Sequence, residues 1–88
     1  MIQKELIVQN RLGVHARPAS LVVSVASKFR SDIHLTKDSV EINAKSIMGV
    51  MMLAAEMGSS ILVTASGEDE LQAIEAIEAL FASKFNED

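Results

Sequence analysis

Four short segments place their apolar residues on one face, and this pattern constrains the fold more than any other feature. Residues 32–37 (DIHLTK) and 39–43 (SVEIN) alternate apolar and polar side chains, and residues 60–66 (SILVTAS) and 2–8 (IQKELIV) place most of their apolar side chains on one face. A strand of this kind buries one face only. Helices must cover that face, which predicts a two-layer α+β sandwich with a largely antiparallel sheet.

The remaining segments carry apolar residues at helical spacing. Residues 16–28 predict one amphipathic helix, and Ile47 to about Leu53 predict a short second one. The final helix opens with the acidic residues 68–70 at its positive end. Its predicted apolar stripe is Leu71, Ile74, Ile77, Leu80 or Phe81, and Phe85. The predicted order is β-α-β-β-α-β-α in a single domain, residues 1–88.

Two turns complete this prediction. Gly13 follows the first strand and suits a positive φ. Lys37, Asp38 and Ser39 form a short turn between two strands, which predicts a hairpin.

Composition excludes several functional classes. The net charge is −4, and the chain contains no tyrosine, tryptophan or cysteine. Such a chain is a poor binder of nucleic acid, and it has no disulfide, thiol nucleophile or thiolate metal site. No apolar run approaches the roughly 20 residues of a membrane-spanning helix, and the N-terminus lacks the features of a signal peptide. We therefore expect a cytoplasmic monomer that binds no nucleic acid and inserts into no membrane.

The histidine of GVHARPA, residues 13–19, is the strongest candidate for chemistry. His15 stands at or just before the helix start, whose positive end disfavours a charged imidazolium and favours the neutral, nucleophilic ring. The free amides of Ala16 and Arg17 suit a negative group on that ring, and the Arg17 guanidinium suits phosphate oxygens. These features fit a phosphoryl group carried on His15. A surface histidine without a function is the alternative.

Metal binding and hydrolysis have less support. The only other histidine, His34, is predicted to face solvent from a strand, and no cysteine is present. No Ser-His-Asp arrangement stands out. We therefore expect no metal and no cofactor.

Two motifs resemble those of the HPr family, the histidine-containing phosphocarriers of the bacterial phosphoenolpyruvate-dependent sugar phosphotransferase system. They are GVHARPA and KSIMGVMMLA, residues 45–54, and the similarity extends over essentially the whole chain. The resemblance implies an open-faced β-sandwich, with four antiparallel strands and three helices on one face. It also implies that His15 accepts a phosphoryl group on Nδ1 from phosphorylated enzyme I, assisted by Arg17. The group then passes to IIA components of sugar permeases.

The resemblance further implies a docking patch that enzyme I and the IIA proteins use in turn. The matching residues here are Leu12, Ala16, Ser20, Ile47, Met48, Gly49 and Met51. Methionine suits a surface that must accept several partners, although a methionine stripe is more often part of a core. Arg11, Arg17 and Lys45 are expected to surround the patch with positive charge, which favours acidic partners.

Ser46 has two interpretations. From the residues alone it is the N-cap of the short helix. The resemblance adds regulatory phosphorylation by an HPr kinase/phosphorylase, and the family's partners also include a catabolite-control repressor. A phosphate at this helix start would place negative charge beside the docking patch and weaken enzyme I binding.

Two other functions remain open. The C-terminal ALFASKFNED resembles a nitrogen-related branch of the family, in which the carrier has a regulatory role, whereas KSIMGVMMLA is closer to the sugar branch. The same two-layer architecture also serves small binding modules without covalent chemistry. Phosphorylation of His15 would separate a carrier from such a module.

Overall fold

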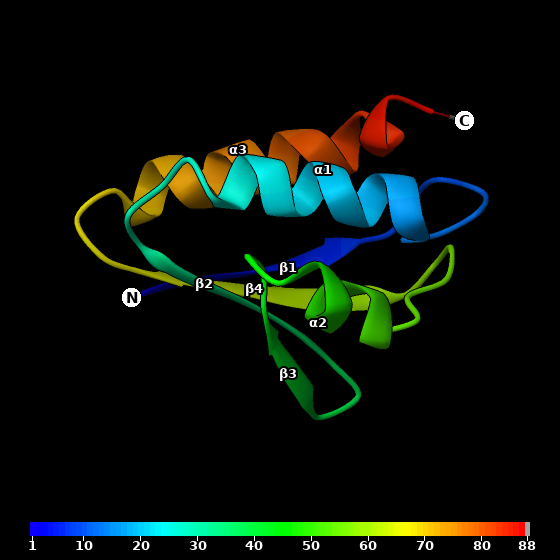
Figure 1. Cartoon of the computed structure of the whole chain (residues 1–88), viewed down its shortest axis with the longest axis horizontal. Helices are drawn as coiled ribbons and strands as arrows, with labels where there is room; N and C mark the ends of the chain where they lie inside the picture. Colours follow the sequence, from blue (N-terminus) through cyan, green and yellow to red (C-terminus); the bar gives the residue numbers. More distant parts are fainter. Residues whose placement is uncertain (88) are drawn as a thin grey trace.

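The computed structural model describes residues 1–87, and its elements follow the predicted order. Residues 1–87 form four strands, three α-helices and a final short 3-10 turn, and Figure 1 shows how the helices and strands are arranged. The elements are β1 (Ile2–Ile7), α1 (Ala16–Ala26), β2 (Asp32–Lys37), β3 (Val40–Asn43), α2 (Ile47–Met52), β4 (Ser60–Ser66), α3 (Glu70–Ala82) and η1 (Lys84–Asn86).

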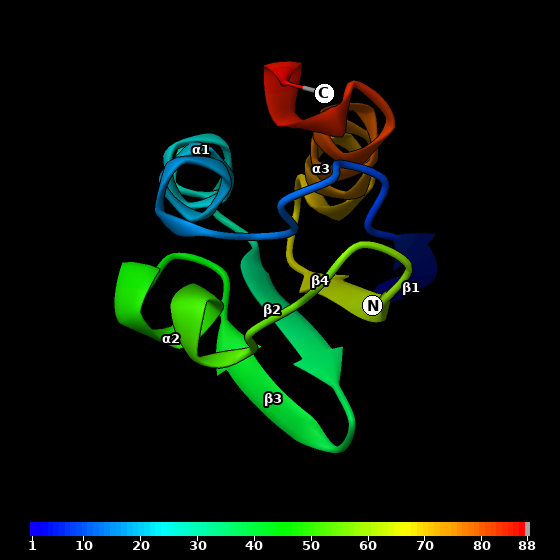
Figure 2. The same ribbon diagram turned by 90° about the vertical axis from the view of Figure 1, so that its right-hand side faces the viewer.

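The strands form one antiparallel sheet in the order β1-β4-β2-β3. Helices α1 and α3 lie side by side over one face of the sheet, and α2 packs against α1 and β3 on the same side (Figure 2). No helix within residues 1–87 covers the opposite face. The predicted open-faced β-sandwich is therefore confirmed.

Burial alternates along the strands, as their sequences predicted. Along β2, Ile33 and Leu35 are buried on the helix side, and His34 is half-buried on the other. The helices complete the core with Ala19, Val22 and Ala26 of α1 and Ala73, Ile74, Ile77, Leu80 and Phe81 of α3. Removal of this apolar surface from water is the main force that holds the two layers together.

The hairpin between β2 and β3 is tighter than predicted. Lys37 belongs to β2 and pairs with Val40, so the turn consists of Asp38 and Ser39 alone. Their φ angles are 49° and 69°, as in a type I′ turn, whose twist matches that of the strands it joins. The prediction that Lys37 forms part of the turn is wrong.

Helix α1 ends slightly earlier than predicted, and α2 ends within one residue of its predicted end. Helix α1 stops at Ala26 rather than at residue 28, because the Lys28 amide bonds three residues back, to Val25 (3.1 Å), instead of four. Helix α2 stops at Met52, because the amide of Leu53 bonds to Val50 (3.3 Å) in the same way.

The apolar stripe of α3 also differs from the prediction. Leu71 is 54 % exposed, so its place in the stripe was wrong, and Ala73 is buried there instead. Phe85 is buried as predicted, but it follows the end of α3 in η1, where the backbone is left-handed. Within residues 1–87, no helix is long and apolar enough to cross a membrane.

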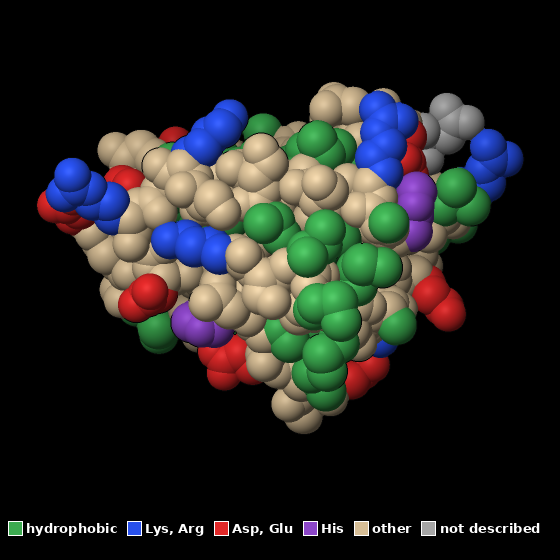
Figure 3. All heavy atoms as spheres, viewed as in Figure 1, with side chains coloured by type: hydrophobic (Ala, Val, Ile, Leu, Met, Phe, Trp, Pro, Cys, Tyr) green, Lys and Arg blue, Asp and Glu red, His purple; other side chains and the backbone are tan. Residues whose placement is uncertain are grey.

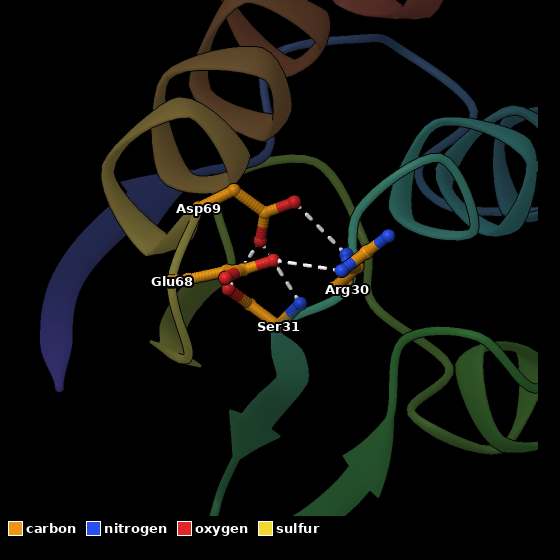
Figure 4. Close-up of polar contacts among 4 residues, drawn as sticks. All are labelled: Arg30, Ser31, Glu68 and Asp69. Atoms are coloured by element: carbon orange, nitrogen blue, oxygen red, sulfur yellow. Dashed lines mark hydrogen bonds and ion pairs between the residues drawn. The ribbon is translucent and has the colours of Figure 1, made fainter.

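The start of α3 is tied to the segment between α1 and β2 (Figure 4). The Asp69 carboxylate accepts hydrogen bonds from the backbone amides of Arg30 and Ser31, both at 2.9 Å, and from the Ser31 hydroxyl at 2.5 Å. Glu68 accepts a further bond from the Arg30 guanidinium at 3.1 Å. The Ser31 hydroxyl first, and then the Arg30 amide, lower the pKa of Asp69 from 3.8 to about 2.

We predict that Asp69→Asn lowers stability at neutral pH and flattens its acid dependence. A lowered pKa in the folded state stabilises above the unfolded value and loses that contribution as pH falls through the folded value. The contribution of Asp69 therefore disappears between about pH 4 and pH 2. Urea unfolding across this range checks the prediction. Asp32→Asn, which removes an exposed carboxylate of β2 that has no partner among residues 1–87, is the control. If the free energy of unfolding depends on pH in the same way for the two variants, the prediction for Asp69 is contradicted.

Candidate functional site

His15 is the N-cap of α1, so the predicted place of this histidine is confirmed. Its φ of −84° and ψ of −165° are extended, its carbonyl accepts the Ala19 amide at 2.9 Å, and its ring caps no backbone amide. The side chain is 40% exposed. Pro18 falls in the first turn, where its missing N–H costs no hydrogen bond.

The loop before His15 is fixed by a close approach to the segment after α2. Gly13 has a φ of +70°, and the Val14 amide donates to the Ala55 carbonyl at 2.8 Å. A Cβ at position 13 would lie 2.3 Å from the same carbonyl oxygen. The predicted glycine turn is confirmed, and the structure adds that only a residue without a side chain fits there.

One nitrogen of the His15 ring is occupied. Its Nε2 lies 3.0 Å from Oε1 of Glu87, and the Asn10 amide Nδ2 donates to the same oxygen at 2.8 Å. Asn10 also donates to the Gly13 carbonyl at 2.6 Å. The hydrogen bonds from Asn10, and then from His15, lower the pKa of the Glu87 carboxyl, although desolvation opposes the shift. Nδ1 of His15 has no hydrogen-bond partner within the described chain.

Donors for an anion lie next to this ring. The amides of Ala16 and Arg17 open α1 and have no acceptor among residues 1–87. The Arg17 side chain is exposed, and its positive charge contributes to lowering the pKa of the Glu87 carboxyl. Arg11, Leu12 and Arg17 line a hollow with Asn86 and Glu87. The two helix amides and the exposed guanidinium of Arg17 can hold a dianionic group without burying it.

An exposed apolar patch adjoins the histidine. Leu12, Ala16 and Met51 line a second hollow together with His15. Leu12 and Met48 are each 71% exposed, and Figure 3 shows hydrophobic side chains gathered in a band across this face. The other exposed members predicted from the sequence are Ser20 and Ile47, and the exposed Met52 and Met57 were not predicted.

Gly49 serves packing in this structure. A Cβ there would lie 3.3 Å from Cβ of Ile42 and 3.4 Å from the Ser46 side chain. The missing side chain thus lets α2 approach β3.

Ser46 caps α2, as the residues alone predicted. Its hydroxyl oxygen accepts the Gly49 amide at 3.1 Å, and the residue is exposed. Met51, near the other end of α2, lines the hollow beside His15. Ser46 therefore stands at the end of α2 that is farther from the ring.

Lys45 does not adjoin the histidine. Its Nζ donates to the Phe29 carbonyl at 2.8 Å, beyond the C-terminal end of α1, whereas His15 precedes the N-terminal end of this helix. The basic groups beside the ring are Arg11 and Arg17. His34 pairs with Asn43 and Thr64 within the sheet. Residues 1–87 contain no cluster of three or more His, Asp or Glu side chains that could hold a metal.

The sequence prediction missed Asn10 and Glu87. The two residues are 77 positions apart, and Glu87 is 72 positions from His15. An asparagine in a loop is typical of turns, so Asn10 carried no signal of its contact with a distant carboxylate. Only the tertiary structure brings this group to the ring.

Comparisons with known proteins agree with this architecture. A family model described as "PTS HPr component phosphorylation site" matches residues 2–83. Phosphocarrier protein HPr of Treponema pallidum is 52% identical over 88 residues, which is 100% of both chains. The crystal structure of HPr from Thermoanaerobacter tengcongensis is 45% identical, with a TM-score of 0.96 over 100% of this chain and 99% of that one.

A further solved relative is Crh of Bacillus subtilis, whose structure is described as an intertwined, domain-swapped dimer. It is 42% identical, with a TM-score of 0.72, and the match covers 100% of this chain and 98% of that one. The fold, the histidine at the N-cap position of α1 and these matches together place the chain among the small open-faced sandwich proteins of the phosphotransferase system. Within that class, this chain belongs to the HPr family of phosphocarrier proteins.

We predict that Gly13→Ala destabilises the protein more than Gly58→Ala does. Both glycines have positive φ, +70° and +91°, so an alanine at either costs about 1–2 kcal/mol in backbone strain. Only at position 13 would the new Cβ also collide with a backbone, whereas nothing lies within 4 Å of it at position 58. Urea denaturation of the two variants measures the difference, and equal losses would contradict the close approach.

Proposed function

We propose that this chain is a phosphoryl carrier whose acceptor is Nδ1 of His15. It takes the group from phosphorylated enzyme I, which obtained it from phosphoenolpyruvate, and passes it to IIA components of sugar permeases. The chain is a carrier in this scheme and not an enzyme, and it requires no cofactor.

One observation carries the proposal. The His15 ring is exposed at the start of α1, and its Nδ1 is unpartnered within the described chain, while Nε2 is held by Glu87. The amides of Ala16 and Arg17 follow the ring at the helix start, and the Arg17 side chain lines a hollow with Glu87, which contacts the ring. These donors suit phosphate oxygens.

Transfer needs only positioning and charge stabilisation from these groups. The Nδ1 lone pair forms the new P–N bond as the bond from phosphorus to the donor breaks, and the donor atom keeps that electron pair. The negative charge on the phosphoryl oxygens then faces the helix start and Arg17. Because the site is open to solvent, the group stays accessible for the next transfer.

The docking patch supports exchange between partners. Leu12 and Met51 are exposed large apolar side chains that line a hollow with His15, and Ile47 and Met48 are exposed on α2. Unbranched methionine side chains adapt to surfaces of different shape. Arg11 and Arg17 add positive charge beside the patch, which favours fast and reversible contacts with acidic partners.

We predict that His15→Ala abolishes phosphorylation and that His34→Ala, which removes the only other histidine, preserves it. The measurement is intact mass spectrometry after incubation with phosphoenolpyruvate and enzyme I. A single acid-labile phosphoryl adduct is expected on the wild type and on His34→Ala. An adduct of equal yield on folded His15→Ala protein would rule out this acceptor, and its absence from all three proteins would favour a binding module without covalent chemistry.

The same assay separates two branches of the family. The sugar-system enzyme I is the donor in our primary proposal, and a nitrogen-branch enzyme I is the alternative donor, because ALFASKFNED resembles that branch. Faster phosphorylation by the nitrogen-branch donor would assign this chain to a regulatory phosphotransfer chain instead of sugar uptake.

We propose a regulatory role for Ser46 as well. The side chain is exposed and caps α2, so an HPr kinase/phosphorylase could reach its hydroxyl without unfolding the core. A phosphate there would add about 1.5–2 negative charges at one end of the docking patch. In this scheme the chain phosphorylated at Ser46 binds enzyme I more weakly and becomes a ligand for a catabolite-control repressor.

We predict that Ser46→Asp slows acceptance from enzyme I on the order of threefold to tenfold, because its charge opposes an acidic partner. Aspartate is also a good N-cap, so stability should change little. Ser46→Asn, which keeps the cap without the charge, is the control. The measurement is the initial rate of phosphorylation at low and high salt. Equal rates for the two variants at low salt would remove the case for a charge switch.

We also propose that the protein is a cytoplasmic monomer. All six residues of β1 pair with β4 of the same chain, so the sheet is complete without a second copy.

A further inference from the structure

We propose that Glu87, held by Asn10, is a positioning residue that keeps the proton of neutral His15 on Nε2 and so leaves Nδ1 as the nucleophile. The assignment of the proton follows from the contacts of the unphosphorylated chain. Its meaning for transfer rests on the proposed function, in which Nδ1 receives the phosphoryl group.

The C-terminal segment turns back toward the helix start. After α3, the residues Lys84, Phe85 and Asn86 have φ angles of 56°, 56° and 60°. Phe85 is fully buried, and its ring centroid lies 4.9 Å from that of Phe81. Three consecutive left-handed residues are costly outside glycine. The buried ring offsets this cost and fixes the direction in which the chain reaches His15.

Asn10 fixes the carboxylate in place. It is completely buried, and its Nδ2 donates both to Glu87 Oε1 at 2.8 Å and to the Gly13 carbonyl at 2.6 Å. Its own Oδ1 is buried without a partner among residues 1–87. A buried acceptor without a hydrogen bond costs free energy. The Asn10 side chain is thus oriented so that its amide nitrogen makes two hydrogen bonds while its oxygen makes none.

The chemistry of these groups determines where the proton lies. An ionised carboxylate only accepts hydrogen bonds, and the Asn10 amide nitrogen only donates. Glu87 is held in its ionised form by the bonds from Asn10 and His15. The ring nitrogen at 3.0 Å must therefore be the donor. A neutral imidazole carries one N–H, so an Nε2 proton leaves the lone pair on Nδ1.

The same contact suits the phosphorylated ring. When Nδ1 bonds to phosphorus, Nε2 keeps its proton and the ring gains positive character. The carboxylate of Glu87 faces that N–H on the side away from the phosphoryl group, so it can stabilise the ring without repelling the phosphate at close range. No proton has to leave or enter the ring during transfer in either direction.

The first test measures the tautomer of His15 in unphosphorylated protein by ¹⁵N NMR, at a pH high enough for the ring to be neutral. In Glu87→Ala we expect the ratio of the Nε2–H to the Nδ1–H tautomer to fall roughly tenfold, the low end for one hydrogen bond to a charged group. Glu87→Gln should give an intermediate ratio, because an amide oxygen still accepts. Glu78→Ala, which removes a carboxylate paired with Lys4 at 2.6 Å, is the control.

The second test uses phosphoramidate, a small donor that needs no docking patch. Its P–N bond breaks as the ring nitrogen attacks phosphorus, and ammonia leaves. In a His34→Ala background, His15 of the otherwise wild-type chain should be modified at Nδ1. Glu87→Ala should produce a substantial share of the Nε2 adduct, because this nitrogen is then unprotected. The two adducts are distinguished by ³¹P and ¹⁵N NMR.

The outcomes separate this inference from the proposed function. An unchanged tautomer ratio in folded Glu87→Ala, or an Nε2 adduct on the chain that retains Glu87, overturns the role of Glu87 whatever enzyme I does. If the tautomer and the adduct shift as expected but no enzyme I phosphorylates His15, the proposed function fails and the positioning role stands.

Discussion

Burial of only one face of the sheet is the constraint on which the site depends. Strands that alternate apolar and polar residues leave a single face for α1, α2 and α3 to cover, so the three helices crowd together. The start of α1 and the segment after α2 then meet at one end of the sandwich, where Val14 bonds to Ala55. A half-exposed histidine and an apolar patch thus become neighbours through the packing that forms the core.

The site itself is built from groups that the core does not need. The ring stands at a helix start, the basic side chains are exposed, and the carboxylate comes from beyond the last α-helix. Asn10 is the exception, because it is buried and bonds to both the loop and the carboxylate. This asparagine connects the loop before α1 to Glu87, which in turn contacts the His15 ring. The ring is therefore oriented without being buried.

The sequence was sufficient for the elements and for the candidate histidine, because both follow from local patterns. Alternation identified the strands, helical spacing identified the helices, and the motif around His15 placed it at a helix start. Local patterns failed where tertiary contacts determine the burial or the hydrogen-bond partner of a side chain. Leu71 fits a helical stripe but faces solvent, and Glu87 reaches His15 across 72 positions. No periodicity in the chain encodes such contacts.

The distribution of methionine has a consequence for the chemistry of the surface. All five methionines are exposed, and none contributes to the buried core of the described residues. Peroxides convert an exposed thioether to a polar sulfoxide, a change that enzymes can reverse. In this chain such oxidation would fall mainly on the apolar band around α2 and would leave the packing between helices and sheet intact. Oxidants would thereby alter what the surface can bind before they alter whether the protein is folded.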